Sequence, residues 1–186
     1  LVKHHRRCDY GNAVVAGERV RRFRVSLPFL GEEQDGACRY PFQPFDSVLV
    51  AHPHGGFACL TALQFHVPAL FAKKAKSKNL DGELYMSTVS SYTYGKDYTV
   101  TLSKKFLHEG DRVLLVDDFL AVGKAMRGLL DICSQAGAEV AGIGIAIEKG
   151  FQSGGQELRE KGYRVTSLAI IDEMREDGEL RFRAQS

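Results

Sequence analysis

The chain has 186 residues, of which 44% are hydrophobic and 26% are charged, proportions that are ordinary for one soluble globular domain with a core of its own. Lys and Arg number 25 against 23 Asp and Glu, too small an excess to indicate a protein that binds nucleic acid or a membrane surface through its net charge. Any ligand must therefore be inferred from particular sites.

The cysteines are few and widely separated, and no two of them form a Cys-x-x-Cys pair: Cys8, Cys38, Cys59 and Cys133. No signal peptide and no apolar run of membrane-spanning length is evident. We therefore expect a protein with reduced thiols in the cytoplasm.

Residues 1–46 show no sustained hydrophobic period and end in a passage rich in Phe and Pro. The basic runs HHRR (4–7) and RVRRFR (19–24) could form an anion- or nucleic-acid-binding patch, but the segment holds six acidic residues against eight Lys and Arg. Charge runs are most often solvated surface. We interpret residues 1–46 as an irregular solvated lobe and residues 47–186 as the core domain.

Strands and helices alternate from Ser47 onward. The first half is predicted to contain strands at 47–51, 69–72, 84–89 and 98–102, and a helix at 57–65. The polar, glycine-containing passage SSYTYGKD separates the last two of these strands. Gating loops are found in such passages, so we predict a mobile lid from about Ser87 to Leu102.

The second half continues the alternation, with strands predicted at 112–118, 140–148 and 163–171 and helices at 124–136 and 156–162. A terminal hairpin is expected around a turn at Asp177 and Gly178. Strands rich in Val, Ile and Leu that alternate with helices indicate an α/β fold, with a mostly parallel sheet and helices on both of its faces.

The adjacent acids Asp117 and Asp118 end a buried strand, and ligands of parallel sheets bind at the carboxyl ends of strands. A structural alternative makes one acid a helix cap and the other a surface residue. Carboxylates accept hydrogen bonds from vicinal hydroxyls, and backbone N–H groups at a helix start hold phosphate. A ribose 5-phosphate would suit both features. The N–H groups would come from Ala121, Val122, Gly123, Lys124 and Ala125.

The segment VLLVDDFLAVGKA (113–125) resembles the phosphoribosyl pyrophosphate (PRPP) motif of the type I phosphoribosyltransferases. The stretch 136–171 resembles the carboxyl-terminal part of the bacterial xanthine-specific members, and segments 71–93 and 102–118 fit the same family. The resemblance spans about residues 47–183. It implies the type I phosphoribosyltransferase fold and a homodimeric, magnesium-dependent enzyme of purine salvage, which joins xanthine to PRPP and releases XMP and pyrophosphate.

The resemblance also assigns roles to the acids and the loop. Asp117 and Asp118 would hold the ribose hydroxyls as the catalytic acids, and the loop 121–125 would hold the 5′-phosphate. Family members usually carry Asn at the position of Val122, but a loop that binds through backbone amides tolerates the change. Mg²⁺ would be bound mainly by oxygens of the substrate, so no protein metal ligand is predicted.

Two lysine positions match the family as well. Lys149 would contact an exocyclic oxygen of the purine while Phe151 stacks on its ring; taken alone, Lys149 could instead pack its stem at a strand end. Lys73 and Lys74 would face the pyrophosphate, although a KKAKSK run is often only solvated.

The sequence departs from the family in two places. The family's Glu-Ser-Ser-Gly loop for pyrophosphate is replaced by AHPHGGF (51–57), in which Gly55 and Gly56 are expected to form an anion-binding turn and His52 and His54 to donate hydrogen bonds. The histidine pair also suggests a metal site, but no third ligand is evident. Residues 1–46 contain no counterpart of the family's amino-terminal hood, whose leucine and asparagine close over the base.

Two other functions remain open from the sequence. A PRPP-sensing transcription regulator of the purine-repressor type uses the same fold without catalysis, but it needs a winged-helix domain, for which 46 residues without periodicity are too few. A phosphoribosyltransferase for hypoxanthine, guanine or adenine is the nearer alternative.

Overall fold

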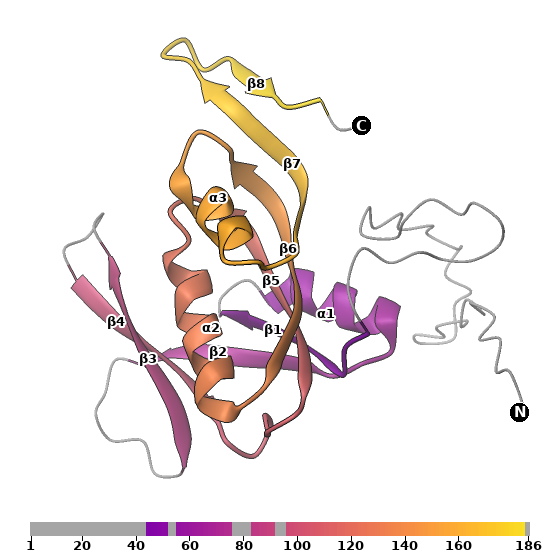
Figure 1. Ribbon diagram of the computed structural model, residues 1–186. Coiled ribbons are helices and arrows are strands. Elements are labelled where there is room, and N and C mark those ends of the chain that lie inside the picture. The colour runs from indigo at the N-terminus through magenta and orange to yellow at the C-terminus, as the bar shows by residue number, and fades with distance from the viewer. Residues whose placement is uncertain (1–43, 52–54, 76–82, 92–95, 185–186) are drawn as a thin grey trace, which may run out of the picture.

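One mixed sheet forms the centre of the protein in a computed structural model (Figure 1). The structure describes residues 44–51, 55–75, 83–91 and 96–184, and within them eight strands follow the spatial order β3-β4-β2-β1-β5-β6-β7-β8. The strands are β1 (Ser47–Ala51), β2 (Ala69–Ala75), β3 (Leu84–Ser91), β4 (Lys96–Ser103), β5 (Arg112–Leu120), β6 (Glu139–Lys149), β7 (Val165–Met174) and β8 (Leu180–Phe182). The helices of the described residues are α1 (Gly55–Phe65), α2 (Lys124–Ala136) and α3 (Ser153–Glu160).

The central strands run parallel, as the sequence predicts. β1 pairs in parallel with β2 and β5, and β6 pairs in parallel with β5 and β7, whereas β3, β4 and β8 join by antiparallel pairing. The helix predicted at 124–136 matches α2, and the α/β fold is confirmed. β5 therefore has its carboxyl end near the middle of the sheet, where ligands of such folds bind.

The two faces of the sheet are covered by different helices (Figure 1). Val48 and Val50 of β1 pack in one core cluster with residues of α1, whereas Leu49 packs in a second cluster with residues of α2 and α3. Successive side chains of a strand point to opposite faces, so a strand covered on both sides has to be apolar throughout. Burial of each large apolar side chain contributes about 1.5–3 kcal/mol to stability. The fully buried side chains on α2 include Met126, Leu129 and Ile132.

The strands predicted at 84–89 and 98–102 match β3 and β4, which form an antiparallel ladder from the pair Leu84 and Ser103 to the pair Ser91 and Lys96. The described part of the predicted lid is therefore strand and not irregular. The β-branched and aromatic residues of this stretch favour paired strands. Residues 92–95 lie outside the described residues, so the mobility of the predicted lid stays a prediction.

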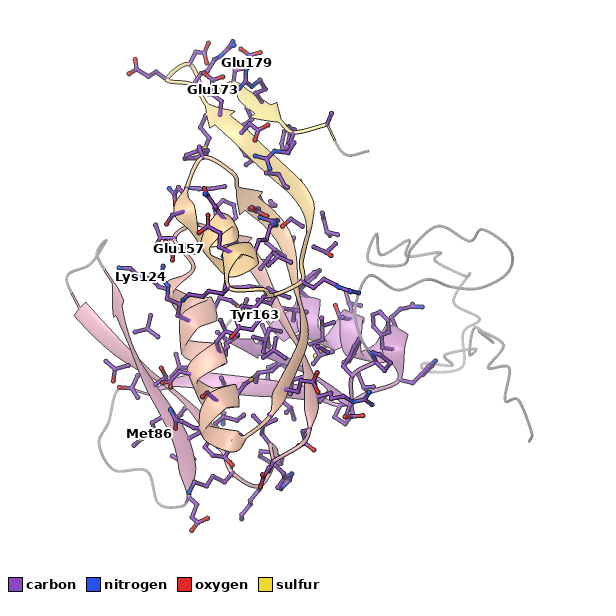
Figure 2. All side chains as sticks on the ribbon, in the orientation of Figure 1. Met86, Lys124, Glu157, Tyr163, Glu173 and Glu179 are labelled. Carbon is purple, nitrogen blue, oxygen red and sulfur yellow. The ribbon has the colours of Figure 1, made fainter. Side chains whose placement is uncertain are left out.

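The β3–β4 hairpin is fixed to α2. The side-chain amide of Gln135 accepts a hydrogen bond from the Met86 backbone N–H at 3.2 Å and donates one to the Met86 carbonyl at 2.7 Å. Figure 2 shows Met86 near the carboxyl end of α2. Closer to the start of the helix, a Cβ added at Gly128 would lie 2.7 Å from Val89 Cγ2, so the missing side chain lets the strand approach. The base of the hairpin is therefore packed rather than free.

The carboxyl-terminal hairpin of β7 and β8 forms as predicted, and Figure 2 shows Glu173 and Glu179 at its outer end. Gly178 has φ of 88°, which lies in the left-handed region that favours glycine. The Asp177 side chain accepts a hydrogen bond from the Glu179 backbone N–H at 3.0 Å, which closes the turn.

Two of the cysteines can be placed. Cys59 is exposed on α1 and Cys133 is buried on α2, and both are free thiols. Burial raises the pKa of the Cys133 thiol to about 12, so it remains protonated in the core. Cys8 and Cys38 lie outside the described residues. Of the helices in the described part of the chain, none is both long and apolar enough to cross a membrane.

Candidate functional site

Strand β5 carries the two acids to the carboxyl edge of the sheet. It runs through Asp117 and Asp118 and ends at Leu120, two residues beyond the predicted end. Asp117 is 5% exposed, and its Oδ1 accepts a hydrogen bond from the Asp118 backbone N–H at 3.1 Å. The alternative in which an acid caps the following helix is wrong, because Gly123 is the N-cap of α2 and no side-chain cap bond is made there.

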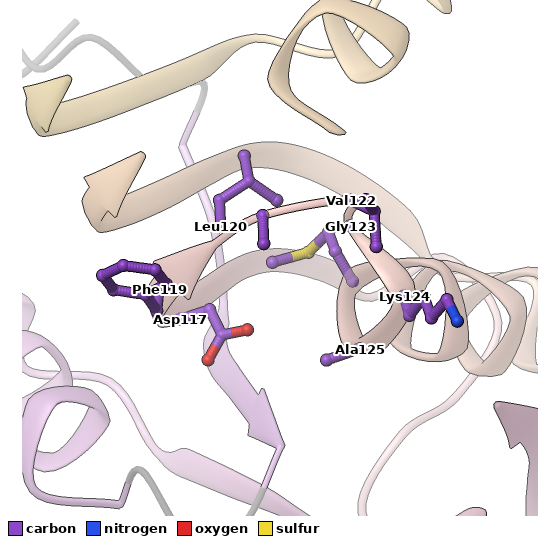
Figure 3. A pocket seen from close by; sticks show the side chains of 9 residues that line it. Asp117, Phe119, Leu120, Val122, Gly123, Lys124 and Ala125 are labelled. Carbon is purple, nitrogen blue, oxygen red and sulfur yellow. The ribbon is translucent and has the colours of Figure 1, made fainter. Parts of the chain in front are cut away.

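A short loop, residues 121–123, joins β5 to α2. Gly123 has φ of 74°, a left-handed conformation that lets the chain turn directly from the strand into the helix. Between the end of the strand and the first helical turn lies a hollow of about 180 Å³. Figure 3 shows the Asp117 carboxylate pointing toward Ala125 across this hollow, and the Phe119 ring pointing away from the loop. The hollow is lined by Asp117, Phe119, Leu120, Ala121, Val122, Gly123, Lys124, Ala125 and Met126.

The structure thus places Asp117 and all five predicted loop residues around one hollow. Asp118 does not line it. The two acids therefore occupy different positions relative to any ligand in the hollow.

Helix α3 supports the loop from behind. The backbone N–H of Gly154 donates a hydrogen bond to the Ala121 carbonyl at 3.1 Å. A Cβ added at Gly154 would overlap this carbonyl oxygen, so only glycine permits the approach. Sequence reasoning missed the contact, although the glycine pair just before the helix predicted at 156–162 was a signal for close backbone packing.

Lys149 ends β6 beside two aromatic rings. Its Nζ lies 5.2 Å from the centre of the Phe119 ring and 6.0 Å from the centre of the Phe151 ring, within the range of cation–π attraction. The rings are 42% and 47% exposed, respectively, so each has surface available to a ligand. Sequence analysis singled out Lys149 and Phe151 but missed Phe119, which the pairing of β5 with β6 brings to this place.

The alternation of side chains shifts near the carboxyl ends of β5 and β6. Leu115 and Leu120 both belong to the core cluster under α2, although residues five positions apart in a regular strand face opposite sides. On β6, Ile145 belongs to the same cluster and Glu148 bonds to Arg159 of α3. Leu120 and Glu148 thus face the same side of the sheet. Phe119 and Lys149, which are adjacent to them in the chain, both face the other side and come close to each other.

Glu148 is a buried carboxylate, 2% exposed, directly before Lys149. Arg159 of α3 donates hydrogen bonds of 2.8 and 2.7 Å to its two oxygens, and Ser167 of β7 donates another. Burial raises the pKa of Glu148, but the hydrogen bonds from Arg159 and Ser167 outweigh it, so the pKa lies below its ordinary value. A Cβ added at Gly155 would overlap this carboxylate, so the second glycine of α3 makes room for it. Sequence reasoning missed this network, because its members come from three separate elements.

The other predicted PRPP contacts lie on β2 and α1 or outside the described residues. Gly55 and Gly56 form the first turn of α1 rather than a separate turn before it. Lys73 is exposed on β2, which continues through the lysine pair instead of ending before it. In the part of the chain that the structure describes, no group of three or more His, Cys, Asp or Glu could hold a metal ion. Outside it lie His52, His54 and the side chain of Lys74.

The fold and the hollow define a class of protein, an α/β sheet with an acid-bearing strand and a strand-to-helix loop that line a hollow at its carboxyl edge. A family model described as a phosphoribosyl transferase domain matches residues 46–175. The chain therefore belongs to the phosphoribosyltransferase family.

Individual relatives agree with this assignment. A xanthine phosphoribosyltransferase of Bifidobacterium adolescentis is 55% identical over 142 residues, which cover 75% of this chain and 74% of the relative. One from Alkaliphilus metalliredigens is 44% identical over 172 residues, 91% of this chain and 85% of the relative, so the similarity extends into the first 46 residues. The crystal structure of an adenine phosphoribosyltransferase from Thermoanaerobacter pseudethanolicus is 26% identical, with a TM-score of 0.60 over 69% of this chain and 71% of the other. The predicted type I phosphoribosyltransferase fold is confirmed.

The Glu148 network leads to a prediction about acid stability. A carboxyl whose pKa is lowered by folding stabilises the protein above its unfolded pKa, and this contribution is lost as the pH falls through the folded pKa. We expect Glu148→Gln to reduce the free energy of unfolding at pH 7 by roughly 1–3 kcal/mol, the cost of unpairing a buried donor or acceptor. The difference between wild type and variant should shrink as the pH is lowered below about 4, near the ordinary glutamate pKa.

Urea unfolding at several pH values between 7 and 3 measures this difference. Glu176→Gln, on the exposed turn between β7 and β8, is a control for the loss of one negative charge. A stability difference that stays constant over the whole pH range would contradict an ionised, paired Glu148.

Proposed function

We propose that the protein transfers the 5-phosphoribosyl group of PRPP to xanthine, forming XMP and pyrophosphate. The observation that carries the proposal is the single hollow in which Asp117 faces the loop 121–125, with Lys149 and two aromatic rings on the adjoining strand ends. The relatives named xanthine phosphoribosyltransferases are 44–58% identical to this chain, whereas the adenine enzyme of known structure is only 26% identical. This difference favours xanthine over adenine as the base.

The ribose 5-phosphate would bind in the hollow. The backbone N–H groups at the start of α2 suit the 5′-phosphate, because the helix amino terminus carries a partial positive charge and unpaired donors. The Asp117 carboxylate on the opposite wall would accept a hydrogen bond from a ribose hydroxyl. Asp118, outside the hollow, would contact a hydroxyl only from its rim.

The reaction exchanges one bond to the ribose for another. The bond from ribose C1 to pyrophosphate breaks with its electron pair on the leaving oxygen, and a ring nitrogen of the base forms the new bond to C1. The transition state resembles an oxocarbenium ion, so the protein has to hold the ring in place, stabilise charge and exclude water. No covalent nucleophile is needed.

The base would lie over the end of β6. Lys149 offers donors to an exocyclic oxygen, and Phe151, with Phe119 as a second ring, offers an aromatic surface to the purine. An ammonium group has no acceptor, so it favours a base rich in carbonyl oxygens, such as xanthine.

The pyrophosphate would lie toward α1 and β2, near Gly55, Gly56, Lys73, Lys74 and the histidines at 52 and 54. Mg²⁺ would be held mainly by oxygens of the substrate. Such an ion would neutralise part of the charge on the leaving group. We also propose that the protein acts as a homodimer in the cytoplasm.

The direct test is an assay of pyrophosphate release from PRPP with xanthine, hypoxanthine, guanine and adenine. We expect xanthine to give the highest kcat/KM. A higher value with another base would reassign the substrate. Binding of PRPP without release of pyrophosphate for any purine would instead support a PRPP-sensing regulator.

The acids can be tested by substitution. We expect Asp117→Ala to lower kcat/KM for PRPP by roughly 1.5–3 kcal/mol of transition-state stabilisation, as the loss of charge-assisted hydrogen bonds does. Asp118→Ala should lose less, because this acid does not line the hollow. Steady-state kinetics measure both losses, the Asn variants serve as controls of equal size, and thermal unfolding checks the fold. Wild-type kinetics in both Ala variants would show that the acids do not contact the sugar.

Lys149 is predicted to distinguish the bases. A site built to bond an oxygen at C2 leaves a donor unpaired when hypoxanthine, which lacks this oxygen, is bound. We expect Lys149→Met, which keeps an aliphatic stem, to lower kcat/KM for xanthine roughly 10–100-fold, as expected for a lost hydrogen bond to a charged group, and to lower it less for hypoxanthine. Competition between the two bases measures the ratio, and Lys161→Met on the exposed end of α3 controls for loss of charge. An equal loss for both bases would mean that Lys149 serves an acceptor common to the two.

A further inference from the structure

The carbonyl groups of the loop between β5 and α2 all have partners behind the loop. The Ala121 carbonyl accepts the hydrogen bond from Gly154 N–H at 3.1 Å, and the Gly123 carbonyl accepts one from the Arg127 backbone N–H at 2.9 Å. Between them, the Val122 carbonyl accepts a hydrogen bond from Arg127 Nη2 at 2.8 Å. The middle carbonyl is the only one of the three that is bonded by a side chain.

These bonds set the direction of the N–H groups. In a trans peptide the N–H of one residue points opposite to the carbonyl of the residue before it. The donors to the carbonyls of Ala121, Val122 and Gly123 belong to α3 and α2. The N–H groups of the next three residues, Val122, Gly123 and Lys124, therefore point away from these donors. Three successive N–H groups with a common direction form an anion-binding concavity. The hollow beside Asp117 is lined by Val122, Gly123 and Lys124, the residues that carry these N–H groups.

Arg127 is itself held in place by α3. The same Nη2 atom that bonds Val122 donates a hydrogen bond of 2.7 Å to Glu157 Oε2. Figure 2 shows Glu157 on α3 beside the start of α2, where Lys124 lies. The side chains of Arg127 and Glu157 are 44% and 39% exposed, so the pair on its own adds little to stability. Its geometry points to another role.

We infer that Arg127, anchored by Glu157, is a positioning residue that keeps the peptide between Val122 and Gly123 turned so that its N–H faces the bound phosphate. Arg127 does not line the hollow, so it acts through the loop and not on the ligand. The inference rests on the proposed function only in taking the loop as the site of the 5′-phosphate.

A competing explanation can be separated by the sign of its effect. If Arg127 acted only through its positive charge, removal of the Glu157 carboxylate would leave more positive charge near the loop and would tighten phosphate binding. If Arg127 positions the peptide, Glu157→Ala frees the guanidinium and weakens phosphate binding. Loss of Arg127 itself weakens binding under both explanations, so the glutamate variant decides between them.

The experiment uses the full chain and four variants: Arg127→Met, Arg127→Lys, Glu157→Ala and the control Arg112→Met. Arg112 has a similar exposure, 40%, and pairs with Asp46 at 3.2 Å, but it lies at the amino end of β5, away from the hollow. Calorimetry with ribose 5-phosphate gives the dissociation constant, and hydrogen exchange of peptides covering 121–125 reports the loop without any ligand. Steady-state kinetics give KM for PRPP and for xanthine separately, and thermal unfolding gives Tm.

We expect Arg127→Met to weaken ribose 5-phosphate binding and to raise KM for PRPP by about tenfold, the effect of one charge-assisted hydrogen bond, while KM for xanthine changes less than about twofold. Exchange at 121–125 should become faster. Arg127→Lys should restore part of the affinity, because an ammonium can bridge the same two oxygens. Glu157→Ala should weaken binding in the same direction, and Arg112→Met should leave both KM values unchanged even if its Tm falls.

Three outcomes would overturn the inference. The first is unchanged ribose 5-phosphate affinity and exchange in Arg127→Met, the second is tighter binding in Glu157→Ala, and the third is a loss in Arg127→Met that matches the one in Arg112→Met. A wild-type protein that binds ribose 5-phosphate but does not use xanthine would refute the proposed function and leave the role of Arg127 to be judged by the calorimetry and exchange. A wild type that binds no ribose 5-phosphate would overturn both.

Discussion

The direction of a few peptide groups governs how this site can work. A loop of backbone amides binds an anion only if its carbonyls are turned away, because carbonyl oxygens repel phosphate. Here the turn is made at Gly123, whose left-handed conformation sends the chain from β5 directly into α2, and each carbonyl of the loop finds a donor behind it. The packing of α3 through Gly154 is part of this arrangement. The loop consists of consecutive residues, but its conformation also depends on α3, which is distant from it in the sequence.

Backbone that is fixed by its neighbours also explains the position of Asp117. Asp117 reaches the hollow because β5 continues as a strand to Leu120 and pairs on both sides, with β1 and with β6. Paired backbone cannot rearrange to follow a ligand, so the carboxylate is fixed before any ligand arrives. The buried Glu148 plays a comparable part on β6, since its bonds to Arg159 and Ser167 tie three elements together directly beneath Lys149. Rigid strands and paired charges thus hold the candidate contacts.

Local sequence patterns predicted the helices and strands well, but they could not predict the contacts between these elements. The apolar periodicity of 124–136 and the Val- and Leu-rich strand SVLVA depend on burial alone, and both match the structure. The strands predicted at 84–89 and 98–102 are present, but β3 continues to Ser91 and β4 begins at Lys96, because pairing between the two strands overrides the polar character of the residues at their ends. Phe119 was missed because its place beside Lys149 follows from a shift of alternation in two adjacent strands. Glu148 and Arg159 were missed because no local pattern marks a pair that meets only through the packing of α3 on the sheet.

The contact between Gln135 and Met86 has a consequence for assembly. β3 is an edge strand of the described sheet, and the free N–H and carbonyl groups of an edge are the usual place where a second chain adds a strand. At Met86 both groups are already taken by one side-chain amide from α2. A second copy that extended the sheet across β3 would have to displace this amide and would find α2 in its way. At this point the edge therefore resists growth into a continuous intermolecular sheet.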